Sequence, residues 1–70
     1  MIRDDKELKI TLDRINHFQQ IVQNLRRSEP NPATYKAAVE GYLAEIDRMN
    51  LEVHEYLAAH PKELRTNSSV

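Results

Sequence analysis

Residue types that staple small folds or build catalytic sites are missing or rare in this 70-residue chain. It contains no cysteine, which excludes disulfides and cysteine-based zinc or iron–sulfur sites. Its one glycine, Gly41, excludes a glycine-rich phosphate-binding loop. Because so short a chain buries a smaller share of its surface than a typical domain, oligomerisation is the expected additional source of stability.

Long apolar runs and an excess of one charge are missing as well. No stretch reaches the ~18 apolar residues of a membrane span, and residues 1–6 lack the apolar centre of a signal peptide. We therefore expect a cytoplasmic protein that does not enter membranes. The net charge of −1 implies no polyanionic partner. Direct nucleic-acid binding is thus not favoured, although Arg26, Arg27 and Lys36 lie near the predicted turn.

The sequence does contain a seven-residue apolar repeat in each half. Steps of three and four keep apolar side chains on one side of a helix, so each run predicts a helix that packs on a partner. The predicted fold class is all-α, an antiparallel helical hairpin with a heptad-like seam. The residues expected to be buried in this seam are Ile15, Phe18, Val22, Val39, Tyr42, Ile46, Met49 and Val53.

The limits of the first helix are marked at both ends. Asp4, with Glu7 three residues later, has the form of a capping box, in which two side chains bond backbone N–H groups reciprocally. Arg26 and Arg27 place positive charge in the last turn, where it suits the helix dipole. These signals predict a helix over about residues 5–28.

Proline and asparagine separate the two helices. Pro30 and Pro32 disfavour helical backbone in the residue before each, and Asn31 suits the N-cap of a helix that begins with Pro32. So short a connection favours an antiparallel hairpin over residues 1–60. The predicted organisation is a first helix at about 5–28, a turn at 29–31, a second helix at about 32–59 and a flexible tail at 61–70.

Small residues on the second helix form one candidate surface for self-association. A glycine that weakens the helix, aligned with alanines three and four residues apart, indicates the close approach of another helix. The simpler alternative is that alanine is a good helix former on a solvated face. This small-residue stripe consists of Ala37, Gly41, Ala44, Leu51 and Ala58.

The apolar surface beside the seam is a second candidate. Leu12, Leu43 and Leu57 flank the seam, and Ile10 and Ile21 lie off it on the first helix. Together they are wider than one partner helix covers, so we expect two hairpins to pair into a four-helix bundle, as a dimer or tetramer. Alternatively, these side chains only broaden the contact within one hairpin.

The sequence carries no recognisable catalytic or metal-binding constellation. His17, His54 and His60 lack the spacing of a ligand pair, and no serine or cysteine nucleophile can be placed beside a base. The prediction is a protein that is not an enzyme and holds no cofactor or metal.

One polar face of the second helix is a candidate contact surface. Asp47, Asn50 and His54 share it at steps of three and four, which suits a weak divalent-ion site or a polar contact with a partner, although solvation explains it more simply. With Arg48, they form the partner face on which we expect a heterologous protein to bind.

Both helices contribute to a resemblance. The chain opens with Met1-Ile2-Arg3-Asp4-Asp5-Lys6-Glu7, its first helix reaches Leu25, and its second ends with Ile46, Met49, Val53, Tyr56 and Leu57. Over about residues 1–60 it resembles the N-terminal helical segment before the helix-turn-helix domain of some bacterial XRE-type antitoxins. The resemblance implies a non-catalytic role in dimerisation and in covering a toxin or its regulatory partner. It does not extend to a DNA-binding domain, so it implies no operator binding.

The leading functional hypothesis is therefore a small helical protein-interaction module that self-associates and binds a partner protein, such as a toxin. Two alternatives remain open. One is a purely structural homo-oligomer, and the other is a small ligand- or metal-binding bundle that uses the interior between paired hairpins.

Overall fold

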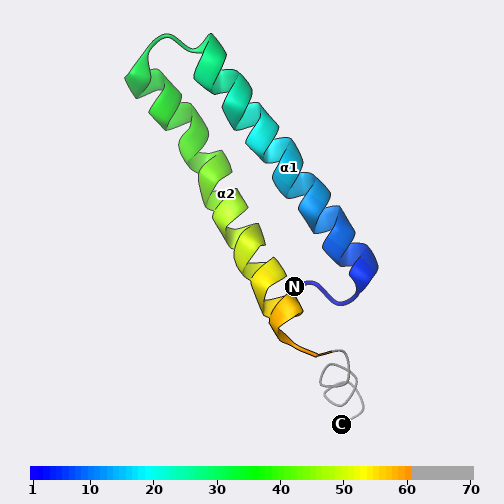
Figure 1. Ribbon diagram of the computed structural model, residues 1–70. Helices are drawn as coiled ribbons and strands as arrows, with labels where there is room; N and C mark the ends of the chain where they lie inside the picture. The colour runs from blue at the N-terminus through cyan, green and yellow to red at the C-terminus, as the bar shows by residue number, and fades with distance from the viewer. Residues whose placement is uncertain (61–70) are drawn as a thin grey trace.

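The computed structural model describes residues 1–60, which form two helices side by side. α1 spans Asp5–Ser28 and α2 spans Pro32–Ala58. They run antiparallel, so this part of the chain is an all-helical hairpin (Figure 1). α2 ends one residue before the limit expected from the sequence, and the expected flexible tail, 61–70, lies outside the described residues.

Side-chain hydrogen bonds determine where α1 begins. The Asp4 carboxylate accepts a bond of 2.8 Å from the backbone N–H of Glu7, as the capping box predicts. The reciprocal bond differs from the prediction, because the Glu7 carboxylate accepts the backbone N–H of Arg3, also at 2.8 Å, and not that of Asp4. Each carboxylate thus satisfies a backbone donor that has no partner inside the helix.

The turn between the helices is built from extended residues and two caps. Glu29, which ends α1, donates its backbone N–H to the carbonyl oxygen of Leu25 at 2.9 Å. The Asn31 side chain then accepts the backbone N–H groups of Ala33 and Thr34, at 2.9 and 3.3 Å. No residue from 1 to 60 has a positive φ, so the chain reverses here without glycine. Proline and an N-cap are therefore sufficient for the hairpin.

The core lies in the seam and is thin. Ile15, Ile46 and Met49 form a buried cluster, and Phe18, Val22 and Val53 pack against it while remaining half-buried. Val39 is also buried, at 3% exposure. The ring of Phe18 meets that of Tyr42 edge-on, with centroids 5.6 Å apart. Full burial was the wrong expectation for Phe18, Tyr42, Val22 and Val53, since two helices alone leave the sides of their seam open.

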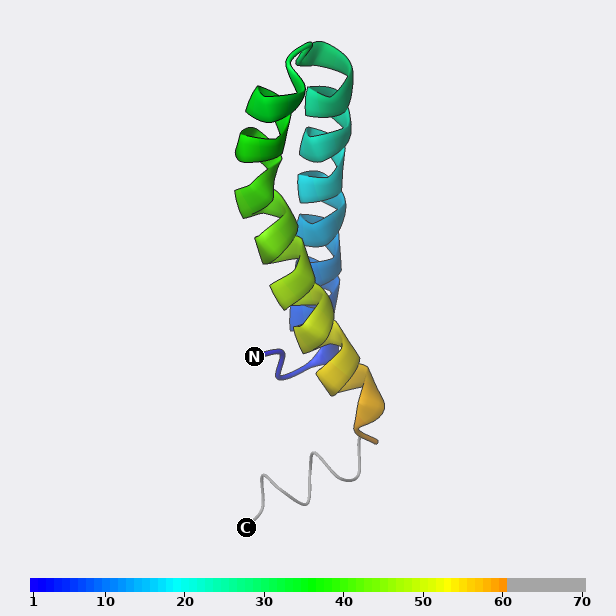
Figure 2. The same ribbon diagram turned by 90° about the vertical axis from the view of Figure 1, so that its left-hand side faces the viewer.

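Ile2 joins the core from outside both helices, which the sequence did not predict. The segment before α1 turns back beside the end of α2, as both views of the hairpin show (Figures 1 and 2). Ile2 is only 8% exposed there, whereas its neighbour Met1 is 98% exposed. This segment therefore covers one side of the seam at the open end of the hairpin.

Several large apolar side chains stay outside the core. They belong to both helices and are 44–63% exposed: Ile10, Leu12, Leu43, Leu51 and Leu57. Neither α1 nor α2 combines the length and hydropathy that crossing a membrane requires. On the surface of the described hairpin, these five side chains leave apolar area in contact with water.

Candidate functional site

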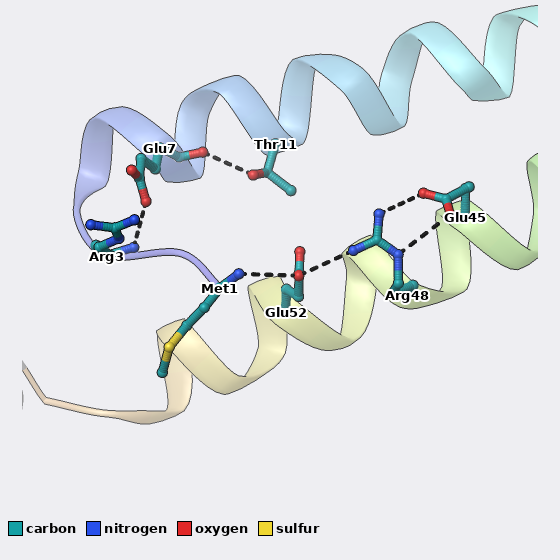
Figure 3. A network of polar contacts seen from close by, with 7 residues as sticks. All are labelled: Met1, Arg3, Glu7, Thr11, Glu45, Arg48 and Glu52. Carbon is teal, nitrogen blue, oxygen red and sulfur yellow. Dashed lines mark hydrogen bonds and ion pairs between the residues drawn. The ribbon is translucent and has the colours of Figure 1, made fainter.

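One side of the hairpin carries a network of charged groups. Arg48 pairs with Glu45 at 2.6 Å and with Glu52 at 3.3 Å, and Glu52 also accepts the amino group of Met1 at 3.3 Å (Figure 3). The hydrogen bond between Glu45 and Arg48 holds the pKa of Glu45 below its ordinary value and raises the pKa of Arg48. The network thus holds the N-terminal segment against α2. We call this side the charged face.

A single hydrogen bond ties the two helices together at their open end. The Tyr56 hydroxyl donates to the Asp5 carboxylate at 2.7 Å. Because the neutral phenol is the form that donates, this bond raises the pKa of Tyr56 to about 12, and partial burial and the charge of Asp5 act in the same direction. With the Phe18–Tyr42 contact, it shows which residues of α1 lie opposite which residues of α2.

The charged face contains two open hollows near the N-terminal segment. The first has a volume of about 310 Å³, and Ile2, Glu52 and Tyr56 contribute to its walls. The second, of about 420 Å³, extends along the seam past Arg14 and Arg48. Their walls combine apolar side chains with charged groups, of which Arg48 and Glu52 are paired with each other.

The histidines are spread along the hairpin. His17 on α1 lies beside Phe18, with ring centroids 6.3 Å apart, and His54 is exposed on α2. Across residues 1–60, no three histidine, aspartate or glutamate side chains come together as metal ligands would. In the weak divalent-ion site considered for Asp47, Asn50 and His54, the Asp47 and His54 side chains are therefore not joined by a third histidine, aspartate or glutamate from this part of the chain.

The small-residue stripe faces away from α1. All five of its residues are exposed, and a Cβ added at Gly41 would meet no heavy atom within 4 Å. A contact with α1 therefore does not account for this glycine, and the stripe stays a candidate surface for self-association.

The predicted partner face is divided in the structure. Asp47, Asn50 and His54 are exposed on α2. Arg48 turns instead toward Glu45 and Glu52 on the charged face (Figure 3). Side chains one position apart on a helix point about 100° from each other, so Arg48 and Asp47 lie on different sides. Only three of the four predicted residues thus share a surface.

Leu12, Leu43 and Leu57 share one side of the hairpin, which we call the leucine face. Leu12 precedes the core residue Ile15 by three positions, and Leu43 precedes Ile46 by three, so both are rotated equally about their helices from the seam. In two antiparallel helices, equal rotation leads to the same face. Leu57, four positions after Val53, is rotated in the same direction.

The leucine and charged faces are opposite sides of the hairpin. Arg14 and Glu45 directly precede Ile15 and Ile46, so they are rotated from the seam in the other direction. The sequence had indicated the leucines as flanks of the seam but not that they gather on one side. Comparison with known proteins finds no matching family model, curated protein or solved structure.

Proposed function

We propose that the chain is a non-catalytic helical interaction module, which pairs with a second copy into a four-helix bundle and in that form binds a partner protein. The observation that carries the proposal is the mismatch between the apolar surface and the core. The described part buries five apolar side chains, while Leu12, Leu43, Leu51 and Leu57 remain 44–63% exposed. Association with a second hairpin would remove such side chains from water.

The electrostatics support the non-catalytic part of the proposal. A group that transfers protons needs a pKa close to the working pH. Glu45 shifts downward, whereas Arg48 and Tyr56 shift upward. Each shift holds the group more firmly in the charge state that it already has at neutral pH. These contacts are suited to maintaining structure and not to acid–base chemistry.

The resemblance to antitoxin segments supports a toxin as the heterologous partner. In that role the hairpin would present a paired helical surface, and it would need no catalytic group of its own. The exposed polar residues Asp47, Asn50 and His54 are the surface that the sequence indicates for this contact.

Sedimentation equilibrium across the micromolar range tests self-association. We expect a mass twice the 8.2 kDa of one chain. We also expect a melting temperature that rises with protein concentration, because association stabilises the folded form by mass action. A species of 8.2 kDa whose melting temperature does not depend on concentration would contradict the proposal.

A further inference from the structure

The leucine face is self-complementary along α2. Leu43 and Leu57 lie seven residues before and after Asn50, and seven residues bring a helix back to nearly the same direction. The two leucines therefore flank Asn50 at equal distances on one side of α2. A two-fold rotation about an axis beside Asn50, perpendicular to the helix, places a second α2 antiparallel to the first. Each Leu43 then lies against a Leu57, and each Asn50 lies against the other Asn50.

Leu12 of α1 lies close to the same centre. The Tyr56–Asp5 hydrogen bond and the Phe18–Tyr42 contact place it opposite Met49, about 2 Å along the axis from Asn50. The same two-fold rotation that pairs the α2 helices therefore brings Leu12 close to Leu12 of the second copy. An interface of this kind uses one patch on both subunits, as two-fold dimers do.

We propose that two copies pair through the leucine face about a two-fold axis at Asn50. In this dimer α2 runs antiparallel to the α2 of the second copy, and Leu43 contacts its Leu57. The inference rests on the proposed self-association and specifies its surface and register.

Polar groups around the leucines fit this arrangement. Asp47 and His54 are also placed almost symmetrically about Asn50, so each Asp47 carboxylate faces a His54 imidazole of the other copy, which can donate a hydrogen bond to it. The two Asn50 amides can pair at the centre, as asparagines do in helical interfaces where they fix the register. The three exposed residues of the predicted partner face would then contact a second copy of this chain in place of a heterologous protein, which would bind another surface of the dimer.

The area of the face is also sufficient. Two helices of this length, side by side, present a surface of about 40 Å by about 20 Å, or about 800 Å² per copy. Each partner in a stable interface of standard size contributes about this area. The small-residue stripe, by comparison, offers one large side chain, Leu51, and the charged face is partly covered by the N-terminal segment.

Matched charge variants test which face is used. Leu43→Glu and Leu51→Glu change exposed leucines of the same helix, one on the leucine face and one on the small-residue stripe. We expect Leu43→Glu to weaken the dimer Kd about 100-fold, because the change occurs twice in a two-fold dimer, and Leu51→Glu to leave it unchanged. The opposite result would assign self-association to the stripe and overturn this inference while leaving the proposed function intact. A wild-type protein that is monomeric would instead overturn both.

Mixing variants tests the register. Leu57→Lys alone should also weaken the dimer. When it is mixed with Leu43→Glu, however, we expect a heterodimer. One of its two contacts pairs the introduced glutamate with the introduced lysine, and the other remains Leu43 against Leu57. A mixture that stays monomeric would overturn the proposed register.

Single cysteines test the interface without adding charge to it. Because the chain has no cysteine of its own, Leu12→Cys and Leu51→Cys each introduce one thiol. Under mild oxidation at micromolar concentration, we expect Leu12→Cys to form a disulfide-linked dimer and Leu51→Cys to remain uncrosslinked. Crosslinking of Leu51→Cys alone would overturn the inference.

Discussion

The core assignment predicts that two isoleucines of α1 differ sharply in their contribution to stability. Ile15 is 7% exposed in the central cluster, whereas Ile10, five residues earlier, is 51% exposed. Replacing a buried isoleucine with alanine costs about 2–5 kcal/mol, and in so thin a core, which can partly collapse, we expect about 3 kcal/mol for Ile15→Ala. For Ile10→Ala we expect about 1 kcal/mol or less, because only half of the side chain leaves water on folding.

This pair of variants is closely matched. Both replace isoleucine with alanine inside α1, so the gain in helix propensity, a few tenths of a kcal/mol, is the same for each. Neither side chain belongs to the leucine face, so neither change removes a contact of the proposed dimer directly.

Urea unfolding followed by far-ultraviolet circular dichroism, at one fixed protein concentration, measures the difference. With a slope of about 1 kcal/mol per molar urea for a chain of this size, the two midpoints should differ by about 2 M. Equal midpoints, or a larger loss for Ile10→Ala, would show that the helices do not meet along the Ile15–Ile46 seam.

Two further predictions concern the ends of α2. Asn31→Ala removes the acceptor for the N–H groups of Ala33 and Thr34 and should lower the free energy of unfolding by about 1 kcal/mol. Asn31→Asp keeps an acceptor and should lower it little. Equal urea midpoints for the two variants would contradict the role of Asn31 as the N-cap. The raised pKa of Tyr56 predicts stability that is complete below pH 10 and lost as the pH rises to about 12, because ionisation removes the donor. Tyr56→Phe should lack this loss in urea unfolding at successive pH values, and an identical loss in Tyr56→Phe would contradict it.

The limits of the helices could be predicted because their signals are local. Asp4 and Asn31 bond backbone N–H groups two or three residues away, and Pro32 needs only its own restricted φ. None of these interactions depends on tertiary structure. At the end of α2, where Ala59 is the C-cap residue, the prediction differs from the structure by one residue.

Contacts between distant parts of the chain could not be predicted in the same way. Ile2 is an isolated apolar residue ahead of the first helix, so no periodicity indicates that it packs on α2. The Tyr56–Asp5 bond joins residues 51 positions apart. Its existence depends on the register of the hairpin, which the heptad pattern alone leaves free to shift by a turn.

The contacts of Arg48 show which part of the candidate site the sequence could predict and which part it could not. The sequence offers Glu45 three residues before it and Glu52 four residues after it, and both spacings allow an ion pair on a helix. In the structure Arg48 contacts both, and Glu52 in turn holds the N-terminal segment. The contact of Glu52 with the N-terminal segment could not be read from the sequence, whereas helix geometry alone already separates Arg48 from Asp47.

The charged face and the leucine face differ in how far the single chain already covers them and pairs their charged groups. On the charged face, the N-terminal segment covers part of the seam, and three ion pairs satisfy Arg48, Glu45 and Glu52. On the leucine face no segment of the described chain covers the leucines, and the nearby polar side chains, such as Asn50, are exposed. A second hairpin therefore gains more from the leucine face, where it removes apolar area from water without first breaking an ion pair.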